Sequence, residues 1–435
     1  MPMLRLDARS ADFEAQFLAL LDMKRETDAD VNAAVAAIIA DVRSRGDEAL
    51  IEYTKRFDRL PELSAGTLRI TKAEVDAALT EVPADLMTSL ELAAERIGDF
   101  HRRQLPESYA YTDAAGVRLG CRWSAVQAAG LYVPGGTAAY PSSVLMNAVP
   151  AKVAGVDRLV MVVPTPDGKL NPLVLAAARL AGVDEIYRVG GAQAVAALAF
   201  GTDTICPVDK IVGPGNAYVA AAKRQVFGTV GIDMIAGPSE ILVVADGAND
   251  PSWIAADLLS QAEHDTAAQS ILITDDSSFG DRVAQAVESH LATLPRAKIA
   301  RESWEAHGAI IVVPDLDAAV PLVDRVAPEH LELAVADPDA LAAKIRNAGA
   351  IFLGRYTPEA VGDYVGGPNH VLPTARSARF SSGLGVHDFM KRTTMLGCDA
   401  DSLRAIGPAA VALAGAEGLG AHGLSVALRL NLGRG

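Results

Sequence analysis

The residues best suited to acid–base chemistry lie next to each other in the segment DRVAPEHLELAV, residues 324–335. Glu329 and His330 directly follow Pro328, which lacks a backbone N–H and restricts the residue before it, so we expect a turn at this point. A neutral imidazole is the usual general base near pH 7, and a carboxylate can activate water. Adjacent residues do not share a face of a helix or a strand, so the two side chains need not touch and could face one pocket from two directions. The alternative interpretation is a structural core histidine beside a capping glutamate.

A second group of polar residues has the chemistry of a metal site. Gln261 and His264, in LLSQAEHDTAAQS (258–270), are three positions apart and would share one face of a helix. An amide oxygen and an imidazole nitrogen suit zinc or a similar divalent ion, but two ligands do not complete a site. Asp363, in the glycine-flanked segment PEAVGDYVGGPNHVLPT (358–374), is a further candidate ligand. The alternatives are an exposed polar helix face and a turn-forming aspartate, and His370 in the same segment is more typical of a structural histidine.

Three glycine-rich turns indicate a nucleotide site. Each follows a predicted strand and opens a predicted helix, at residues 132–143, 189–202 and 212–223. Such turns present backbone N–H groups and a helix N-terminus to an anion, although ordinary turn chemistry also explains each one alone. The segment GLGAHG (418–423) has a literal G-x-G-x-x-G spacing. It lacks a preceding strand and a following sheet, so we do not interpret it as a dinucleotide-binding turn.

The hydrophobic pattern predicts the elements that position these residues. One apolar helix face recurs between residues 31 and 42, with Gly46 placed to end that helix, and a T-x-x-E capping box at 71–74 opens another before Pro83 breaks it. Buried strands alternating with alanine-rich helices then predict two parallel sheets. The predicted strands lie at 159–163, 185–189, 209–213, 240–246, 270–276, 309–313, 331–335 and 350–354. The strand signal ends near residue 380, and the last fifty residues look helical.

Composition limits the class of protein. Asp+Glu number 54 against 39 Lys+Arg, a net charge of -15, which argues against nucleic acid or an anionic membrane as a partner. The three cysteines, Cys121, Cys206 and Cys398, are far apart and imply no disulfide framework. The N-terminal residues lack an apolar signal core, and no apolar run is long enough to span a membrane. We therefore expect a cytoplasmic enzyme.

Taken together, the motifs resemble those of the histidinol dehydrogenase family, in the right order from about residue 28 to 428. The matching segments are GLYVPGG, YPSSVLMNAVPAKVAGV, VGGAQAVAALAFGT, KIVGPGNAYVAAAKR, IDMIAGPSEILV, DLLSQAEHD, APEHLEL, GDYVGGPNHVLPT, ARFSSGL and EGLGAHGLSV. The expected fold class is α/β, with two tandem Rossmann-like parallel-sheet domains, a helical N-terminal segment and a C-terminal dimerisation tail. We assign 1–124 to a helical region packing with the second α/β domain, 125–236 to the NAD-binding domain, 237–380 to the second domain with the metal and catalytic residues, and 381–435 to a helical tail reaching the partner's active site.

The resemblance implies a role for each matching residue. It makes Glu329 and His330 the catalytic pair and places one Zn2+ per subunit on Gln261, His264, Asp363 and a partner subunit's His422. The substrate contacts would be Ser239, Gln261, His264, His330, Asp363, Glu417 and His422, and the NAD contacts Tyr132, Gln193 and Asn216. A homodimer with shared active sites follows.

The implied reaction is the oxidation of L-histidinol through L-histidinal to L-histidine with two NAD+, the last steps of histidine biosynthesis. His330 would accept and return protons, Glu329 would activate water, and zinc would position the substrate. Three alternatives stay open: a relative that oxidises another small alcohol or diol, a metal-dependent hydrolase, and a non-catalytic binding protein. Gly423 departs from the family pattern, in which a basic residue often follows the Ala-His pair, and this puts the local packing of the tail in doubt.

Overall fold

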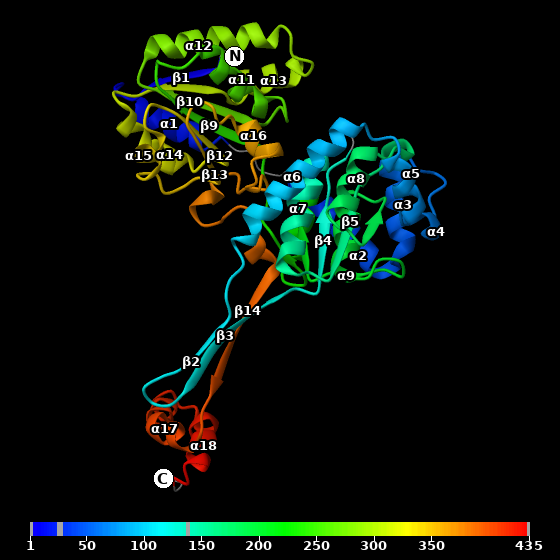
Figure 1. Ribbon diagram of the computed structural model, residues 1–435, viewed down its shortest axis with the longest axis vertical. Helices are drawn as coiled ribbons and strands as arrows, with labels where there is room; N and C mark the ends of the chain where they lie inside the picture. Colours follow the sequence, from blue (N-terminus) through cyan, green and yellow to red (C-terminus); the bar gives the residue numbers. More distant parts are fainter. Residues whose placement is uncertain (1–2, 24–28, 136–139, 433–435) are drawn as a thin grey trace.

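The computed structural model describes residues 3–23, 29–135 and 140–432. It contains two parallel sheets, each covered by helices on both faces, and a long antiparallel ribbon that ends in two helices (Figure 1). The predicted α/β class with two parallel-sheet domains is therefore confirmed. Every strand predicted from the hydrophobic pattern is present in one of the two parallel sheets.

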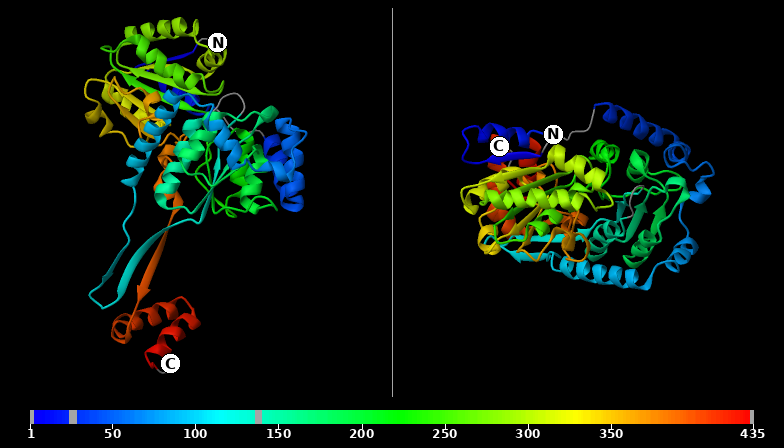
Figure 2. Two further views of the ribbon diagram at one scale, coloured as in Figure 1. Left: turned by 45° about the vertical axis from the view of Figure 1, so that its right-hand side comes forward. Right: turned by 90° about the horizontal axis from the view of Figure 1, so that it is seen from above.

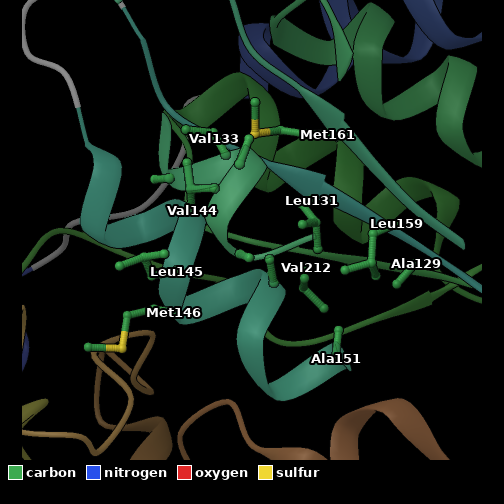
Figure 3. Close-up of a cluster of buried hydrophobic side chains, with 14 of the residues drawn as sticks. Ala129, Leu131, Val133, Val144, Leu145, Met146, Ala151, Leu159, Met161 and Val212 are labelled. Carbon is green, nitrogen blue, oxygen red and sulfur yellow. The ribbon is translucent and has the colours of Figure 1, made fainter. Parts of the chain in front are cut away.

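The first domain is built on a five-stranded parallel sheet in the order β6-β5-β4-β7-β8. Its strands are β4 (Ala128–Tyr132), β5 (Arg158–Val162), β6 (Glu185–Tyr187), β7 (Lys210–Val212) and β8 (Gly231–Ile232). The connecting helices are α7 (Pro141–Ala154), α8 (Pro172–Leu180), α9 (Gly191–Phe200) and α10 (Ala217–Val226). Figure 3 shows one face of this sheet packing on α7, with Leu131, Leu159 and Met161 of the strands against Val144 and Leu145. These side chains are fully buried.

The second domain is built on a six-stranded parallel sheet in the order β1-β11-β10-β9-β12-β13. Its strands are β1 (Leu4–Asp7), β9 (Glu240–Ala245), β10 (Gln269–Thr274), β11 (Ala309–Val312), β12 (His330–Ala334) and β13 (Ala350–Leu353). One face packs on α11 (Pro251–Ala262), α12 (Ser277–Leu291) and α13 (Ala297–His307). The other packs on α1 (Phe13–Leu21), α14 (Val320–Val326) and α15 (Pro338–Ala342). A short helix, α16 (Glu359–Tyr364), follows β13.

The N-terminal helices do not pack where we expected. Only β1 and α1 belong to the second domain, whereas α2 (Ala29–Arg45), α3 (Asp47–Asp58), α4 (Ala65–Leu68), α5 (Lys72–Leu79) and α6 (Ala84–Arg102) lie against the first. The physical reason is the apolar face at Val35, Ile38 and Val42, which is buried against α9 and α10. The local signals are confirmed: Gly46 follows the end of α2 at φ +56°, and Thr71 and Glu74 form the capping box of α5.

The region before residue 125 and the C-terminal tail also contain strands that the hydrophobic pattern did not indicate. β2 (Tyr109–Thr112), β3 (Arg118–Ala125) and β14 (Met390–Gly397) form an antiparallel sheet, so neither region is wholly helical. The ribbon carries α17 (Ala400–Ala416) and α18 (Gly420–Arg429) away from both domains (Figures 1 and 2). Its strands expose both faces for most of their length, so they lack the simple alternation that marks a half-buried strand. Among the described residues, no helix is long and apolar enough to cross a membrane.

Candidate active site

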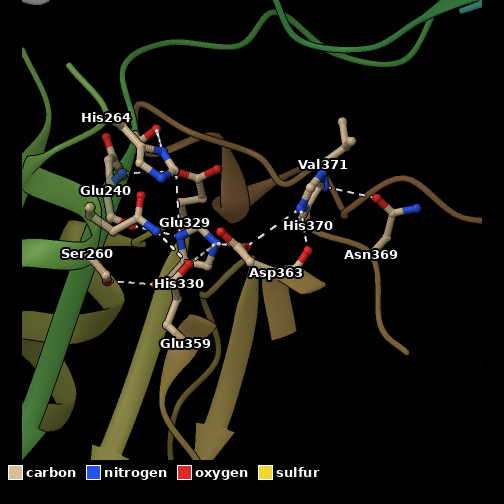
Figure 4. A network of polar contacts seen from close by, with 12 residues as sticks. Glu240, Ser260, His264, Glu329, His330, Glu359, Asp363, Asn369, His370 and Val371 are labelled. Carbon is tan, nitrogen blue, oxygen red and sulfur yellow. Dashed lines mark hydrogen bonds and ion pairs between the residues drawn. The ribbon is translucent and has the colours of Figure 1, made fainter. Parts of the chain in front are cut away.

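The candidate catalytic residues gather at the amino ends of β9 and β12, neighbouring parallel strands in the centre of the six-stranded sheet. His330 is the first residue of β12 and pairs in register with Ile241 of β9. The C-terminal end of α11 brings Gln261 and His264 to the same edge, and α16 brings Asp363 (Figure 4). Ligands of open α/β sheets usually bind at the carboxyl ends of the strands, so this site lies at the opposite edge.

Glu329 and His330 are both buried and both bind the backbone of Glu240, the first residue of β9. The Glu240 N–H donates to Glu329 Oε2 at 2.9 Å, and the Glu240 carbonyl lies 2.9 Å from His330 Nδ1. The turn expected at Pro328 is present, with Ala327 in the left-handed region at φ +46°. The two side chains lie closer than adjacency alone required, because His330 Nδ1 is 3.6 Å from Glu329 Oε2.

This arrangement determines which nitrogen of His330 is available for chemistry. A carbonyl oxygen can only accept, so Nδ1 carries the proton that it donates to Glu240. Nε2 is buried, lies 3.7 Å from Asp363 Oδ1 and 3.8 Å from Glu359 Oε1, and makes no hydrogen bond to a described residue. Nε2 is therefore the atom of His330 that a substrate would meet.

The electrostatics of the site are dominated by carboxyl groups around one imidazole. Burial alone would lower the pKa of His330, but Glu329, Asp363 and Glu359 outweigh it and raise the pKa to about 10. Burial raises the pKa of Glu329 to about 8 and, together with Asp363, that of Glu359 to about 8. The pKa of Asp363 lies well below its usual value, because the neighbouring histidines outweigh the opposing effect of burial. The site thus holds protons near neutral pH that isolated side chains would not.

The proposed metal ligands offer a donor set that zinc accepts. Gln261 Oε1 is buried and has no hydrogen-bond partner among the described residues, although the Gln261 amide nitrogen donates to Glu359 Oε1 at 2.6 Å. His264 lies at the rim, with Nδ1 3.4 Å from Ser239 Oγ, and desolvation lowers its pKa so that the imidazole is neutral. Together with the Asp363 carboxylate, this makes one amide oxygen, one imidazole and one carboxylate, so the residues present fit a zinc ion.

A cavity of about 510 Å³ opens beside these residues and is lined by His330, Asp363 and His370. The His370 imidazole lies between the two domains: Nδ1 is 3.0 Å from the Asp363 carbonyl, and Nε2 is 3.4 Å from Ser143 Oγ at the start of α7. Because α7 follows β4, this contact brings the carboxyl edge of the five-stranded sheet next to the site.

The three predicted cofactor residues lie together at that carboxyl edge. Tyr132 ends β4, Gln193 lies in the first turn of α9, and Asn216 caps α10 through Oδ1. The Tyr132 hydroxyl accepts a hydrogen bond from the Gly191 N–H at 3.0 Å. Gln193 Oε1 is buried without a hydrogen-bond partner among the described residues. The structure thus brings all three turns to one edge, although residues 136–139 of the first turn lie outside the described residues.

Two predicted residues do not reach this site within one chain. Glu417 and His422 are exposed and lie on the tail helices at the far end of the ribbon (Figure 1). The sequence analysis missed Glu359, which is 1% exposed. Glu359, His330 and Asp363 are spaced to hold a metal ion, and among the described residues no other group of histidine, cysteine or acidic residues has such spacing. The position of Glu359 four residues before Asp363 on one helix is the signal that could have identified it.

The chain is similar to known proteins along most of its length. The family model for histidinol dehydrogenase matches residues 21–430. The histidinol dehydrogenases of Rhodospirillum rubrum and Rhizobium meliloti are 73% and 66% identical, each alignment covering 99% of both chains. The crystal structure of histidinol dehydrogenase from Elizabethkingia anophelis superposes with a TM-score of 0.93 at 36% identity, covering 99% of this chain and 98% of that one. The chain belongs to the histidinol dehydrogenase family, whose members are NAD-dependent oxidoreductases.

Proposed function

We propose that the chain oxidises L-histidinol through L-histidinal to L-histidine, reducing two NAD+ at a zinc-dependent site shared between two subunits. The observation that carries the proposal is the position of His330 Nε2. This nitrogen is buried, makes no hydrogen bond to a described residue and lies 3.7 Å from Asp363 Oδ1, close to the edge that carries Tyr132, Gln193 and Asn216. The similar proteins are named histidinol dehydrogenases. Their names do not favour the two alternative functions, oxidation of a different alcohol and metal-dependent hydrolysis.

In the first oxidation, His330 Nε2 accepts the hydroxyl proton of the substrate while a hydride leaves its carbon for the nicotinamide ring. Zinc held by Gln261, His264, Asp363 and His422 of the partner subunit would position the imidazole and amino nitrogens of the substrate. With zinc bound, Asp363 would attract the His330 proton less, because its charge would be shared with the metal.

In the second oxidation, Glu329 takes a proton from water as that water adds to the aldehyde carbon, and protonated His330 returns its proton to the aldehyde oxygen, which gives the hydrate. The raised pKa of this carboxyl group suits the role, since a general base is most effective when its pKa lies near the working pH. His330 then removes the hydroxyl proton of the hydrate, and a second hydride leaves for a second NAD+. The Glu240 N–H holds Glu329 Oε2 in place throughout.

The sharing of the site between subunits is supported by the exposed tail. Leu413 and Leu428 of α17 and α18 are 65% and 60% exposed, and Leu396 of the ribbon is 70% exposed. Apolar side chains gathered on the end of the tail, which Figures 1 and 2 show away from both domains, indicate a surface that another chain covers. In a homodimer, this tail would bring Glu417 and His422 to the partner's Asp363.

The test is the number of NADH molecules formed per molecule of L-histidinol, with histidinol limiting, NAD+ in excess and the enzyme loaded with zinc. A ratio near two supports both oxidations at one site. A ratio near one means that the aldehyde is released, which contradicts the role of Glu329. The same assay after zinc removal by a chelator, followed by zinc addition, tests whether the metal is required.

A further inference from the structure

We propose that Glu359 is a positioning residue for the metal site, whose carboxylate holds the Gln261 amide with its oxygen turned toward the metal. This inference rests on the proposed zinc site, but it concerns a residue that the reaction scheme above does not use. Glu359 and Gln261 are each 1% exposed, so their contact is shielded from water.

The carboxylate of Glu359 is held by two neighbouring side chains of α11. The Gln261 amide nitrogen donates to Oε1 at 2.6 Å. The Ser260 hydroxyl donates to Oε2 at 2.8 Å, and Figure 4 shows this contact. Each carboxylate oxygen therefore has a partner on the helix that carries Gln261.

This contact determines the orientation of the Gln261 amide. Glu359 Oε1 accepts from the Gln261 amide nitrogen, so the nitrogen faces Glu359 and the amide oxygen points away from it. That oxygen, Oε1, is buried and has no hydrogen-bond partner among the described residues. A buried acceptor without a partner is rare, and here it points to a missing ligand. The same hydrogen bond draws electron density toward the amide oxygen, which strengthens it as a ligand for a cation.

The backbone holds Glu359 in place for this role. Glu359 and Asp363 are four residues apart on α16, so one short helix carries both the positioning carboxylate and a proposed ligand. A Cβ on Gly362 would lie 2.4 Å from the Phe352 ring of β13, so α16 sits against the sheet with no room for a side chain at this position. The face with Glu359 and Asp363 is thereby fixed toward α11.

The experiment measures the zinc dissociation constant of the full-length chain, stripped of metal and titrated in competition with a zinc-binding dye. Glu359→Ala and Glu359→Asp should each weaken zinc binding about 10- to 100-fold, the range seen when a residue behind a metal ligand is lost. Glu359→Asp keeps the charge but is too short for the 2.6 Å contact, so it separates positioning from charge. Glu359→Gln keeps an acceptor for the amide nitrogen and should stay within about threefold of wild type. Glu263→Gln removes a carboxyl group two residues from Gln261 and serves as the matched control.

A double-mutant cycle that combines Glu359→Ala with Gln261→Ala tests whether Glu359 affects zinc binding through the Gln261 amide or as a ligand itself. If it acts through the Gln261 amide, adding Glu359→Ala to Gln261→Ala should weaken zinc binding less than about twofold further. Additive losses, with Glu359→Gln as weak as Glu359→Ala, would make Glu359 a direct ligand beside His330 and Asp363 and overturn the proposal. Wild-type affinity in both Glu359→Ala and Glu359→Asp would overturn it as well. If Glu359→Ala does not fold, Glu359→Asp in the same cycle gives the answer. A wild-type NADH ratio of two alongside either result would leave the proposed function standing.

Discussion

Replacing Lys223 with methionine tests how a buried ion pair stabilises the turn of the first domain that carries Asn216, one of the predicted NAD contacts. Lys223 of α10 is 2% exposed, forms an ion pair with the buried Asp233, and donates to the Gly213 carbonyl at 2.9 Å. Asp233 accepts the Gly213 N–H at 2.8 Å. Gly213 has φ +109°, and a Cβ there would lie 2.1 Å from the Tyr132 carbonyl oxygen. The pair thus binds both sides of one glycine at the start of the turn that carries Asn216.

The expected cost follows from what the substitution leaves behind. Methionine fills a similar volume, but the Asp233 carboxylate stays buried, and the partners that remain to it among the described residues are the N–H groups of Gly213 and Met234. Breaking a buried ion pair in this way costs about 3–5 kcal/mol in the free energy of unfolding. The double variant Lys223→Met/Asp233→Asn should recover part of that loss, because no buried charge remains.

The assay is urea unfolding of the full chain followed by circular dichroism, with the Michaelis constants for NAD+ and histidinol measured in parallel. The constant for NAD+ should rise and that for histidinol should not, because the disturbed turn lies in the first domain. Lys169→Met, an exposed lysine of the same domain, is the control and should stay within about 0.5 kcal/mol of wild type. A loss below about 1 kcal/mol for Lys223→Met would refute the reasoning, since that is the cost of an exposed pair.

Three further predictions concern the second domain and the tail. His330→Asn should lower kcat by about 10²- to 10⁴-fold while histidinol binding, measured by calorimetry, changes little, and full turnover would contradict the role of Nε2. Glu329 and His330 have pKa values of about 8 and about 10, both above their ordinary values. Between pH 7 and pH 10 the folded metal-free chain therefore binds more protons than the unfolded chain. Its free energy of unfolding should therefore fall as pH rises, by up to about 1.4 kcal/mol per pH unit for each titrating group, and the slope should flatten in Glu329→Gln/His330→Asn. Mixing the inactive His422→Ala and Glu329→Gln chains and letting subunits exchange should restore about a quarter of wild-type activity. Half of the dimers are then mixed, and one of the two shared sites in each mixed dimer is intact. No recovery would place His422 in the site of its own chain.

Much of the fold could be predicted because its signals are local. The apolar runs of the central strands, the capping box at Thr71 and the glycine after α2 each act within a few residues, and the structure confirms them. The packing of the N-terminal helices was predicted wrongly, because an apolar helix face shows that it is buried but not which sheet buries it. The ribbon was missed because β2 and β14 are mostly exposed and pair with β3, not with a strand of either parallel sheet.

The candidate site divides in the same way. The sequence by itself determined the order of motifs that resemble one family, and this resemblance predicts that Glu329, His330, Gln261, His264 and Asp363 carry the chemistry. Only the tertiary structure decided that the site lies at the amino ends of two strands and that Glu359 accepts a hydrogen bond from the Gln261 amide. The contacts responsible join residues 89 to 98 positions apart, from the Glu240 backbone to Glu329 and His330 and from Gln261 to Glu359. Such contacts depend on strand order and register, which are set by the packing of the whole domain and leave no mark on the local sequence.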